Sequence, residues 1–169
     1  MILNLGCGDD DYGDVRVDRY LSRTTTHVTD VEEGLPEEWS DKFDEVYSKC
    51  LLEHCKNPSF VIHEMKRVCK PNGKIVLITD NAAHWRFYHL SKLHLGGYHG
   101  RGAMDRHYCV FTKEHLRNHF QDAGLAIERM EYLSVLKDEK KLKKIDKLLA
   151  LMGFEDAAWA RIKVAAVKR

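Results

Sequence analysis

The link between the first two apolar runs of the chain constrains its fold more than any other feature. LNL at residues 3–5 leads directly into Gly6 and Gly8, and the run VRVD begins only nine residues after the first run ends. A parallel crossover ordinarily takes a dozen or more residues and usually contains a helix. Nine residues can span roughly 30 Å when extended, so the link is reachable but has room for about one helical turn. We therefore expect two neighbouring parallel strands without the usual crossover helix.

Segments typical of strands and helices alternate along the rest of the chain. Apolar runs with strand-like patterning predict strands, and capped apolar stripes predict helices. The predicted strands are residues 1–5, 15–18, 26–29, 43–48, 74–80, 125–133 and 159–167. Helices are predicted after the caps Asn57 and Thr112, and a lysine-rich helix is predicted over 138–152. This alternation predicts an α/β domain with a mainly parallel sheet.

Two later segments have a distinct composition. In the lysine-rich helix, one face carries Leu142, Ile145, Leu148, Leu149 and Met152, and we expect this face to cover the sheet. Residues 82–107 are rich in histidine, aromatic residues and glycine, and we expect a helix across 82–95 followed by a loop. This segment is the predicted lid and ligand-binding part of the protein.

Length and composition indicate a single domain that covers residues 1–169. No apolar stretch approaches the roughly 20 residues that a membrane span needs, and no signal peptide is recognised, so we expect a cytoplasmic protein without membrane association. Five scattered cysteines without a C-x-x-C pair argue against a disulfide framework and a structural zinc site. The composition does not determine the oligomeric state.

Charge is unevenly distributed along the chain. Residues 1–60 contain 6 Lys/Arg against 14 Asp/Glu, whereas residues 61–169 contain 21 against 12. The second half could therefore face an acidic partner, although a solvated basic surface explains the same pattern. No basic stretch is interleaved with aromatic residues, so nucleic acid is not expected as the substrate.

Ligands of such sheets bind beyond the carboxyl ends of the strands. Gly6 has no β-carbon and lets the backbone approach a ligand closely, and Asp18 could accept hydrogen bonds from both hydroxyls of an adenosine ribose. Asp30, with the backbone of Val31, could meet an adenine edge. A phosphate-binding loop is excluded because no G-K-[ST] follows, and the glycine spacing disfavours a dinucleotide fingerprint, so NAD is a minor alternative.

Four motifs in the first half of the sequence resemble those of a known family. LNLGCG, VRVD, TDVEEGLPEEWSDKFDEVYSKCLLEH and NPSFVIHEMKRVCKPNGKIVLITDN look like successive motifs of class I S-adenosylmethionine-dependent methyltransferases, in the compact group with LNLGCG, LP, FD-x-V, LEH and R-V-x-K-P-x-G. The resemblance covers about residues 2–81 closely and extends more loosely through 107–131. It implies a Rossmann-like fold with helices on both faces of the sheet, here with a shortened first crossover and no amino-terminal helix.

The resemblance also implies a cofactor site for S-adenosylmethionine. The methionine and ribose portions of the cofactor would lie against Gly6, Cys7 and Gly8, and Ser48 would also contact the methionine portion. The ribose hydroxyls would bond to Asp18, and the adenine would lie against Asp30 and Val31. Asn4 stands where many members have an acid, which puts a charge-based contact to the cofactor's amine in doubt.

Methyl transfer needs a general base only when the nucleophile must lose a proton. Histidine titrates near neutrality, and His84 and His107 are therefore the candidate catalytic residues. His54 of the LEH motif could act directly or merely pack a turn. Further candidates after the fifth strand are Asp80, Asn81, Trp85, Phe87, Tyr88, His89, His94, Tyr98 and His99. Their spacing matches no metal-ligand pattern, so no metal is expected.

The sequence thus predicts a methyltransferase that uses S-adenosylmethionine and acts on a small-molecule acceptor. Two alternatives remain open: a methyltransferase for RNA or protein, and a cofactor-binding module without catalysis. The acceptor, and the atom that receives the methyl group, are not indicated by any motif.

Overall fold

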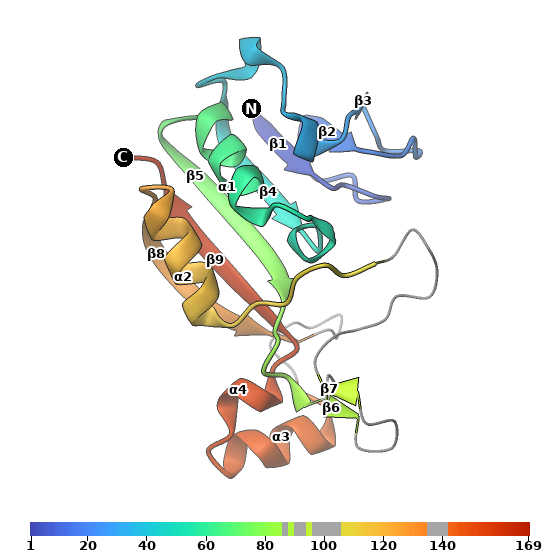
Figure 1. The fold of residues 1–169 in the computed structure, drawn as a ribbon, viewed down its shortest axis with the longest axis vertical. Helices are drawn as coiled ribbons and strands as arrows, with labels where there is room; N and C mark the ends of the chain where they lie inside the picture. The colour runs from blue at the N-terminus through green and yellow to red at the C-terminus, as the bar shows by residue number, and fades with distance from the viewer. Residues whose placement is uncertain (86–87, 90–93, 96–105, 135–141) are drawn as a thin grey trace.

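A computed structural model describes residues 1–85, 88–89, 94–95, 106–134 and 142–169. At its centre is a seven-stranded sheet with the strand order β3-β2-β1-β4-β5-β9-β8 (Figure 1). The neighbouring strands β3, β2, β1, β4 and β5 all pair in parallel. Strand β9 runs antiparallel to both of its neighbours, β5 and β8. The strands are β1 Ile2–Leu5, β2 Val15–Asp18, β3 His27–Val28, β4 Phe43–Lys49, β5 Cys69–Asp80, β8 Ala126–Leu133 and β9 Arg161–Val167. The predicted mainly parallel α/β fold is confirmed.

The two longer helices form where the sequence provides caps. In α1 (Pro58–Val68), the Asn57 side chain accepts a hydrogen bond from the backbone N–H of Phe60, and in α2 (Lys113–Asp122) Thr112 forms a capping box with His115. Both helices agree with prediction. The remaining helical elements are α3 Lys144–Leu151, α4 Glu155–Ala158 and the short 3-10 turns η1 Val31–Glu33, η2 Glu37–Trp39 and η3 Leu52–His54.

The first crossover contains no helix, as its length predicts. Strands β1 and β2 pair directly in parallel, with Leu3 opposite Val15 and Leu5 opposite Val17. The link is fixed at both ends: the backbone N–H of Gly6 donates to the carbonyl of Val17 at 2.8 Å, and at the other end the Asp14 carboxylate accepts from a backbone N–H of β1. The strand ends therefore lie side by side despite the short link.

The described helices that pack on the sheet, α1 and α2, lie on the same face (Figure 1). Between them and the sheet lies the hydrophobic core, which includes Leu3, Val46, Ile62, Met65, Ile75, Leu116, Phe120 and Val164. The opposite face was expected to carry helices as well, but it carries cross-strand ion pairs such as Glu45–Lys74 and Glu131–Lys163. The reason is that the links 6–14 and 19–26, which would cross this face, are too short for helices.

The lysine-rich segment differs from prediction. Its described part forms one short helix, α3, and residues 135–141 lie outside the described residues. The apolar residues Ile145, Leu148 and Met152 are exposed and do not cover the sheet, whereas Asp146 is buried and accepts a hydrogen bond from Trp85 Nε1 at 2.7 Å. This contact turns the polar side of α3 inward, so the prediction that its apolar face packs on the sheet is wrong.

The segment after β5 also differs from the expected helix. Residues 82–85 form a turn, and β6 (Tyr88–His89) pairs with β7 (His94–Leu95) as a separate antiparallel ladder. Residues 86–87, 90–93 and 96–105 lie outside the described residues, and so do the candidates Phe87, Tyr98 and His99. Across the part of the chain that the structure describes, no helix is both long and apolar enough to cross a membrane.

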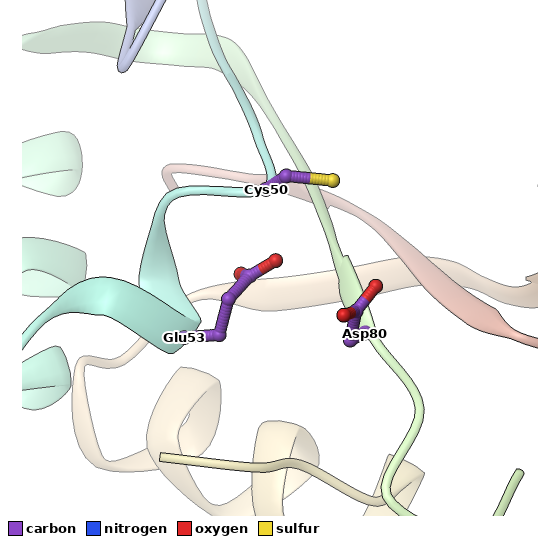
Figure 2. A group of neighbouring side chains, drawn as sticks. All are labelled: Cys50, Glu53 and Asp80. Atoms are coloured by element: carbon purple, nitrogen blue, oxygen red, sulfur yellow. The ribbon is translucent and has the colours of Figure 1, made fainter. Parts of the chain in front are cut away.

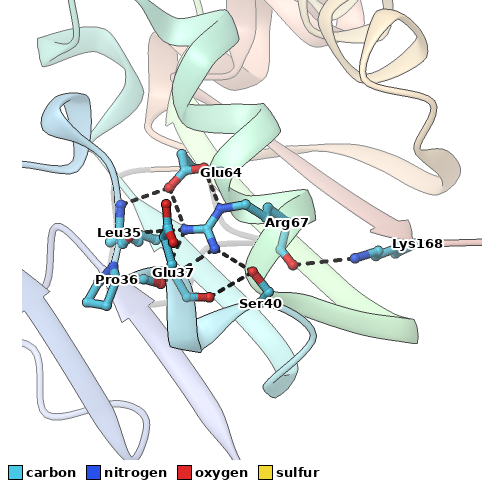
Figure 3. A network of polar contacts seen from close by, with 7 residues as sticks. All are labelled: Leu35, Pro36, Glu37, Ser40, Glu64, Arg67 and Lys168. Atoms are coloured by element: carbon cyan, nitrogen blue, oxygen red, sulfur yellow. Dashed lines mark hydrogen bonds and ion pairs between the residues drawn. The ribbon is translucent and has the colours of Figure 1, made fainter.

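An arginine on α1 anchors the loop that follows η1 (Figure 3). Arg67 Nε and Nη2 donate to the two carboxylate oxygens of Glu64 at 2.7 and 2.8 Å, and Arg67 also donates to the Leu35 carbonyl at 2.8 Å and to Ser40 Oγ at 2.7 Å. The buried Glu64 carboxylate accepts in addition from the backbone N–H of Leu35. The network therefore joins α1 to the loop 34–40.

The same network predicts a pH dependence of stability. Arg67 and the Leu35 N–H both bond to the ionised carboxylate, and they lower the pKa of Glu64. Because the folded-state pKa is lowered, this stabilisation is complete above the pKa of an unfolded glutamate, near 4, and is lost as pH falls through the lower folded pKa. We expect Glu64→Gln to flatten the fall in the free energy of unfolding between about pH 5 and pH 3, measured by urea titration. Glu114→Gln on the exposed side of α2 should leave the slope unchanged, and equal slopes in all three proteins would contradict this role.

Candidate active site

A cavity of about 230 Å³ opens at the carboxyl edge of the sheet. Four residues predicted to bind the cofactor line it: Gly6, Asp18, Asp30 and Val31. They come from the ends of β1 and β2 and from the turn after β3. The short first crossover thus still brings the predicted strand ends to one cavity.

The turn after β1 requires glycine at its first position. Gly6 has a φ of +69°, and a β-carbon placed there would lie 2.8 Å from Leu51 Cβ, closer than packed atoms come. Gly8 has a φ of +52° and faces open space. The Cys7 side chain is buried with its sulfur 3.7 Å from Thr25 Oγ1, so it points toward the β2–β3 loop. Neither Gly8 nor Cys7 lines the cavity.

Asp18 is oriented by two backbone donors. The N–H of Gly8 donates to Oδ2 at 2.9 Å and the N–H of Tyr20 donates to Oδ1 at 3.0 Å. Each carboxylate oxygen keeps further acceptor capacity, because a carboxylate oxygen has two lone pairs. A fixed carboxylate at the cavity wall is suited to accept hydrogen bonds from a pair of hydroxyls.

Asp30 caps η1 by accepting from the Glu32 N–H at 3.0 Å, and its other oxygen accepts from Arg19 Nη2 at 2.7 Å. Val31, the first residue of η1, is buried against the core and borders the cavity. The pairing of Arg19 with Asp30 was not predicted, because nothing in the spacing of these two residues indicates that their side chains meet.

Ser48 does not line the cavity. It is fully buried at the end of β4, between Leu5 and Leu77 of the neighbouring strands, and its hydroxyl has no hydrogen-bond partner among the described residues. Cys50 and Leu51, which follow β4, line the cavity instead.

The opposite wall is formed by η3 and the segment 106–109. The backbone N–H groups of Tyr108 and Cys109 donate to the Glu53 carbonyl at 2.8 and 3.2 Å. Nδ1 of His54 lies 3.0 Å from the carbonyl of Arg106, so this nitrogen must donate and carry a proton. His54, Arg106 and Tyr108 all line the cavity.

The structure separates the two predicted catalytic histidines. The His107 ring lies edge-on to His54 with 4.6 Å between the ring centroids, so it adjoins the cavity through His54. His84 is buried beside Trp85, and its Nε2 lies 3.8 Å from Asp146 Oδ1 of α3. His84 does not line the cavity.

Cys50, Glu53 and Asp80 form a polar cluster, in which one side-chain atom of each lies within 4.8 Å of the others (Figure 2). Glu53 is buried and accepts from Thr79 Oγ1 at 2.7 Å. Burial and the nearby Asp80 raise the pKa of Glu53, and burial with Glu53 nearby raises the pKa of Cys50 to about 12. Both shifts favour the protonated forms of these side chains, and we interpret the cluster as a support for the cavity wall. The sequence indicated Asp80 but not the other two.

The sequence matches the family model described as a methyltransferase domain over residues 2–129. No curated protein matches the sequence.

Solved structures with a similar fold cover nearly the whole chain. A SAM dependent methyltransferase from Archaeoglobus fulgidus is 16% identical with a TM-score of 0.65, covering 99% of this chain and 85% of that one. An S-adenosylmethionine dependent methyltransferase from Mesorhizobium loti is 16% identical with a TM-score of 0.60, covering 98% and 90%. Phosphoethanolamine N-methyltransferase 2 from Haemonchus contortus, in complex with S-adenosyl-L-methionine, is 18% identical with a TM-score of 0.62, covering 99% and 48%. At these identities the likeness concerns the fold.

Proposed function

This chain belongs to the methyltransferase domain family, and from that premise we propose that it binds S-adenosylmethionine at the strand ends and transfers the methyl group to a small-molecule acceptor. The observation that supports this proposal most directly is the cavity at the carboxyl edge of the sheet, which Gly6, Asp18, Asp30 and Val31 line together. Ligands of open α/β sheets bind at this edge.

The residues around the cavity fit the adenosyl group. Asp18, held by two backbone N–H groups, would accept hydrogen bonds from the ribose hydroxyls, and Val31 would pack against the adenine beside Asp30. Gly6 lines the cavity without a side chain, so its backbone is open to the methionine portion. Gly8 would act through its backbone, which already orients Asp18. Cys7 and Ser48 are buried and would support this surface from behind.

S-adenosylmethionine supplies a methyl group on a sulfonium, whose positive charge is lost when a nucleophile takes the methyl. The task of the protein is to hold the acceptor in line and exclude water, since orientation alone can supply effective molarities of about 10⁵ to 10⁸ M. We propose that residues 82–107 contribute the acceptor side of the site within the single domain 1–169.

Of the two candidate histidines, we propose His107 as the general base, because its ring contacts the cavity-lining His54 whereas His84 lies beside α3. A base at this position would accept a proton from an acceptor hydroxyl, thiol or ammonium group. His84 would serve by positioning α3 through Asp146.

The activity is tested by incubating the protein with labelled S-adenosylmethionine and a fractionated cell extract. We expect label in the small-molecule fraction. Label in RNA or protein would instead support a macromolecular acceptor. Binding of the cofactor without transfer to any fraction would identify a non-catalytic module.

Asp18→Ala should weaken the binding of S-adenosylhomocysteine by about 1.5 to 3 kcal/mol, the value of hydrogen bonds to a charged group. Asp14→Ala is the matched control, because Asp14 also accepts a backbone N–H, that of Ile2 in β1, but lies at the other end of β2. Titration calorimetry measures both affinities. Unchanged affinity in Asp18→Ala would remove Asp18 from the site.

A further inference from the structure

Helix α3 turns large apolar side chains to the solvent. Ile145, Leu148, Leu151 and Met152 are 55%, 58%, 86% and 61% exposed, and Phe154 just beyond the helix is 56% exposed. Side chains at such spacings adjoin one another on a helix surface. Contiguous exposed apolar surface of this kind marks interaction sites in folded proteins. We call these five residues the α3 face.

The charges around the α3 face are positive. Lys143, Lys144 and Lys147 are exposed, and Lys144 lies between the apolar residues on the helix surface. The one acid in α3, Asp146, is buried and bonded to Trp85, so it does not reach the solvent side. The solvent side of α3 therefore presents aliphatic and lysine side chains together.

Among the described residues next to α3 in the sequence, two acids follow the end of the helix. Glu155 and Asp156 begin α4, and the Asp156 carboxylate is engaged by the hydroxyl of Tyr132. Both acids are exposed at the border of the α3 face. The exposed Lys143, Lys144 and Lys147 outnumber them, so this part of the surface keeps a net positive charge.

We propose that the α3 face binds the surface of a membrane that contains anionic lipids. An amphipathic helix with lysines beside aliphatic side chains lies in the interface, where the aliphatic groups enter the acyl boundary and the lysines meet anionic headgroups. A nucleic acid would pair with the lysines but leave the leucines exposed. A second copy of this chain would bring lysines against lysines.

The position of the α3 face connects this contact with the cavity. Asn81, directly after β5, donates from Nδ2 to the carbonyls of Asp156 and Trp159 at 2.8 and 2.7 Å, which fixes α4 at the carboxyl edge of the sheet. Trp85 fastens α3 to the same edge. Binding through α3 would therefore bring the edge of the sheet that bears the cavity toward the lipid. The contact is peripheral and needs no membrane-spanning helix.

Sedimentation with vesicles tests the proposal on the full chain. We expect binding to vesicles of phosphatidylcholine with phosphatidylglycerol, and little binding to phosphatidylcholine alone. Leu148→Ser/Leu151→Ser, which keeps the charge, should lower the partition coefficient by roughly tenfold or more, because two aliphatic side chains no longer enter the bilayer. Leu21→Ser is the matched control, since Leu21 is 79% exposed in a distant loop and should bind like the wild type.

A second variant tests the electrostatic part. Lys144→Gln/Lys147→Gln should reduce binding to anionic vesicles, and added salt should reduce the binding of the wild type in the same direction. Thermal unfolding verifies that each variant is folded. The proposal is overturned by equal binding to neutral vesicles, or by binding that both leucine substitutions leave intact. It is also overturned if the wild type does not bind vesicles and instead binds RNA or forms a dimer that the leucine variant cannot form.

Discussion

Gly6→Ala should destabilise the fold by about 2 to 5 kcal/mol and abolish high-affinity cofactor binding. A left-handed backbone costs a residue with a β-carbon about 1 to 2 kcal/mol, and overpacking costs about 1 to 3 kcal/mol more. The new methyl group would lie 2.8 Å from Leu51 Cβ and 2.9 Å from Leu51 Cδ1. Because a β-carbon is fixed to the backbone, a rotamer change of Leu51 cannot relieve the closer contact. Both residues line the cavity, so any shift changes its shape.

Gly8→Ala measures the cost of a left-handed backbone without a collision of the new methyl group. Gly8 is also left-handed, but no atom lies within 4 Å of a β-carbon placed there. We expect a loss of only about 1 to 2 kcal/mol in that variant. Urea unfolding gives the stabilities, and calorimetry with S-adenosylhomocysteine gives the affinities. Equal losses in the two variants would show that contact with Leu51 does not explain the requirement for glycine.

Arg67→Ala should lower the free energy of unfolding by about 3 kcal/mol, because it leaves a buried carboxylate without its charged partner. The Glu64 side chain is only 12% exposed, and the guanidinium also satisfies the Leu35 carbonyl and the Ser40 hydroxyl. The loop 34–40 would lose its attachment to α1. Since this loop follows Asp30 and Val31, we also expect weaker cofactor binding.

Arg117→Ala provides the matched control. Arg117 pairs with Glu114 at the same i, i+3 spacing, but the two side chains are 42% and 70% exposed. An exposed pair contributes at most about 1 kcal/mol, so this variant should unfold nearly as the wild type does. Chemical denaturation of both variants gives the comparison. A similar effect at the two positions would contradict a special role of the Arg67 network.

The strand ends were predictable because short-range rules determine them. The apolar runs that end in Gly6 and Asp18 fix where β1 and β2 stop, and parallel pairing then places both ends at one edge. The absent crossover helix followed from the length of the link alone. The same counting for residues 19–26 would also have predicted that the link between β2 and β3 contains no helix on that face.

Other parts of the site depend on tertiary contacts that spacing does not encode. Periodicity predicts which side chains share a face of α3, but the bond between Trp85 and Asp146 decides which way that face turns. His84 follows a strand end in sequence, yet the turn after Asn81 directs it to α3 and away from the cavity. His54 and Arg106 meet across 52 positions, a contact that no local pattern predicts.

A crystal structure of the protein with S-adenosylhomocysteine tests the central claim most directly. We expect the ribose hydroxyls within hydrogen-bond distance of the Asp18 carboxylate, the adenine against Val31, and the methionine portion over Gly6. A ligand bound elsewhere, or bound in this cavity without contact to Asp18, would contradict it.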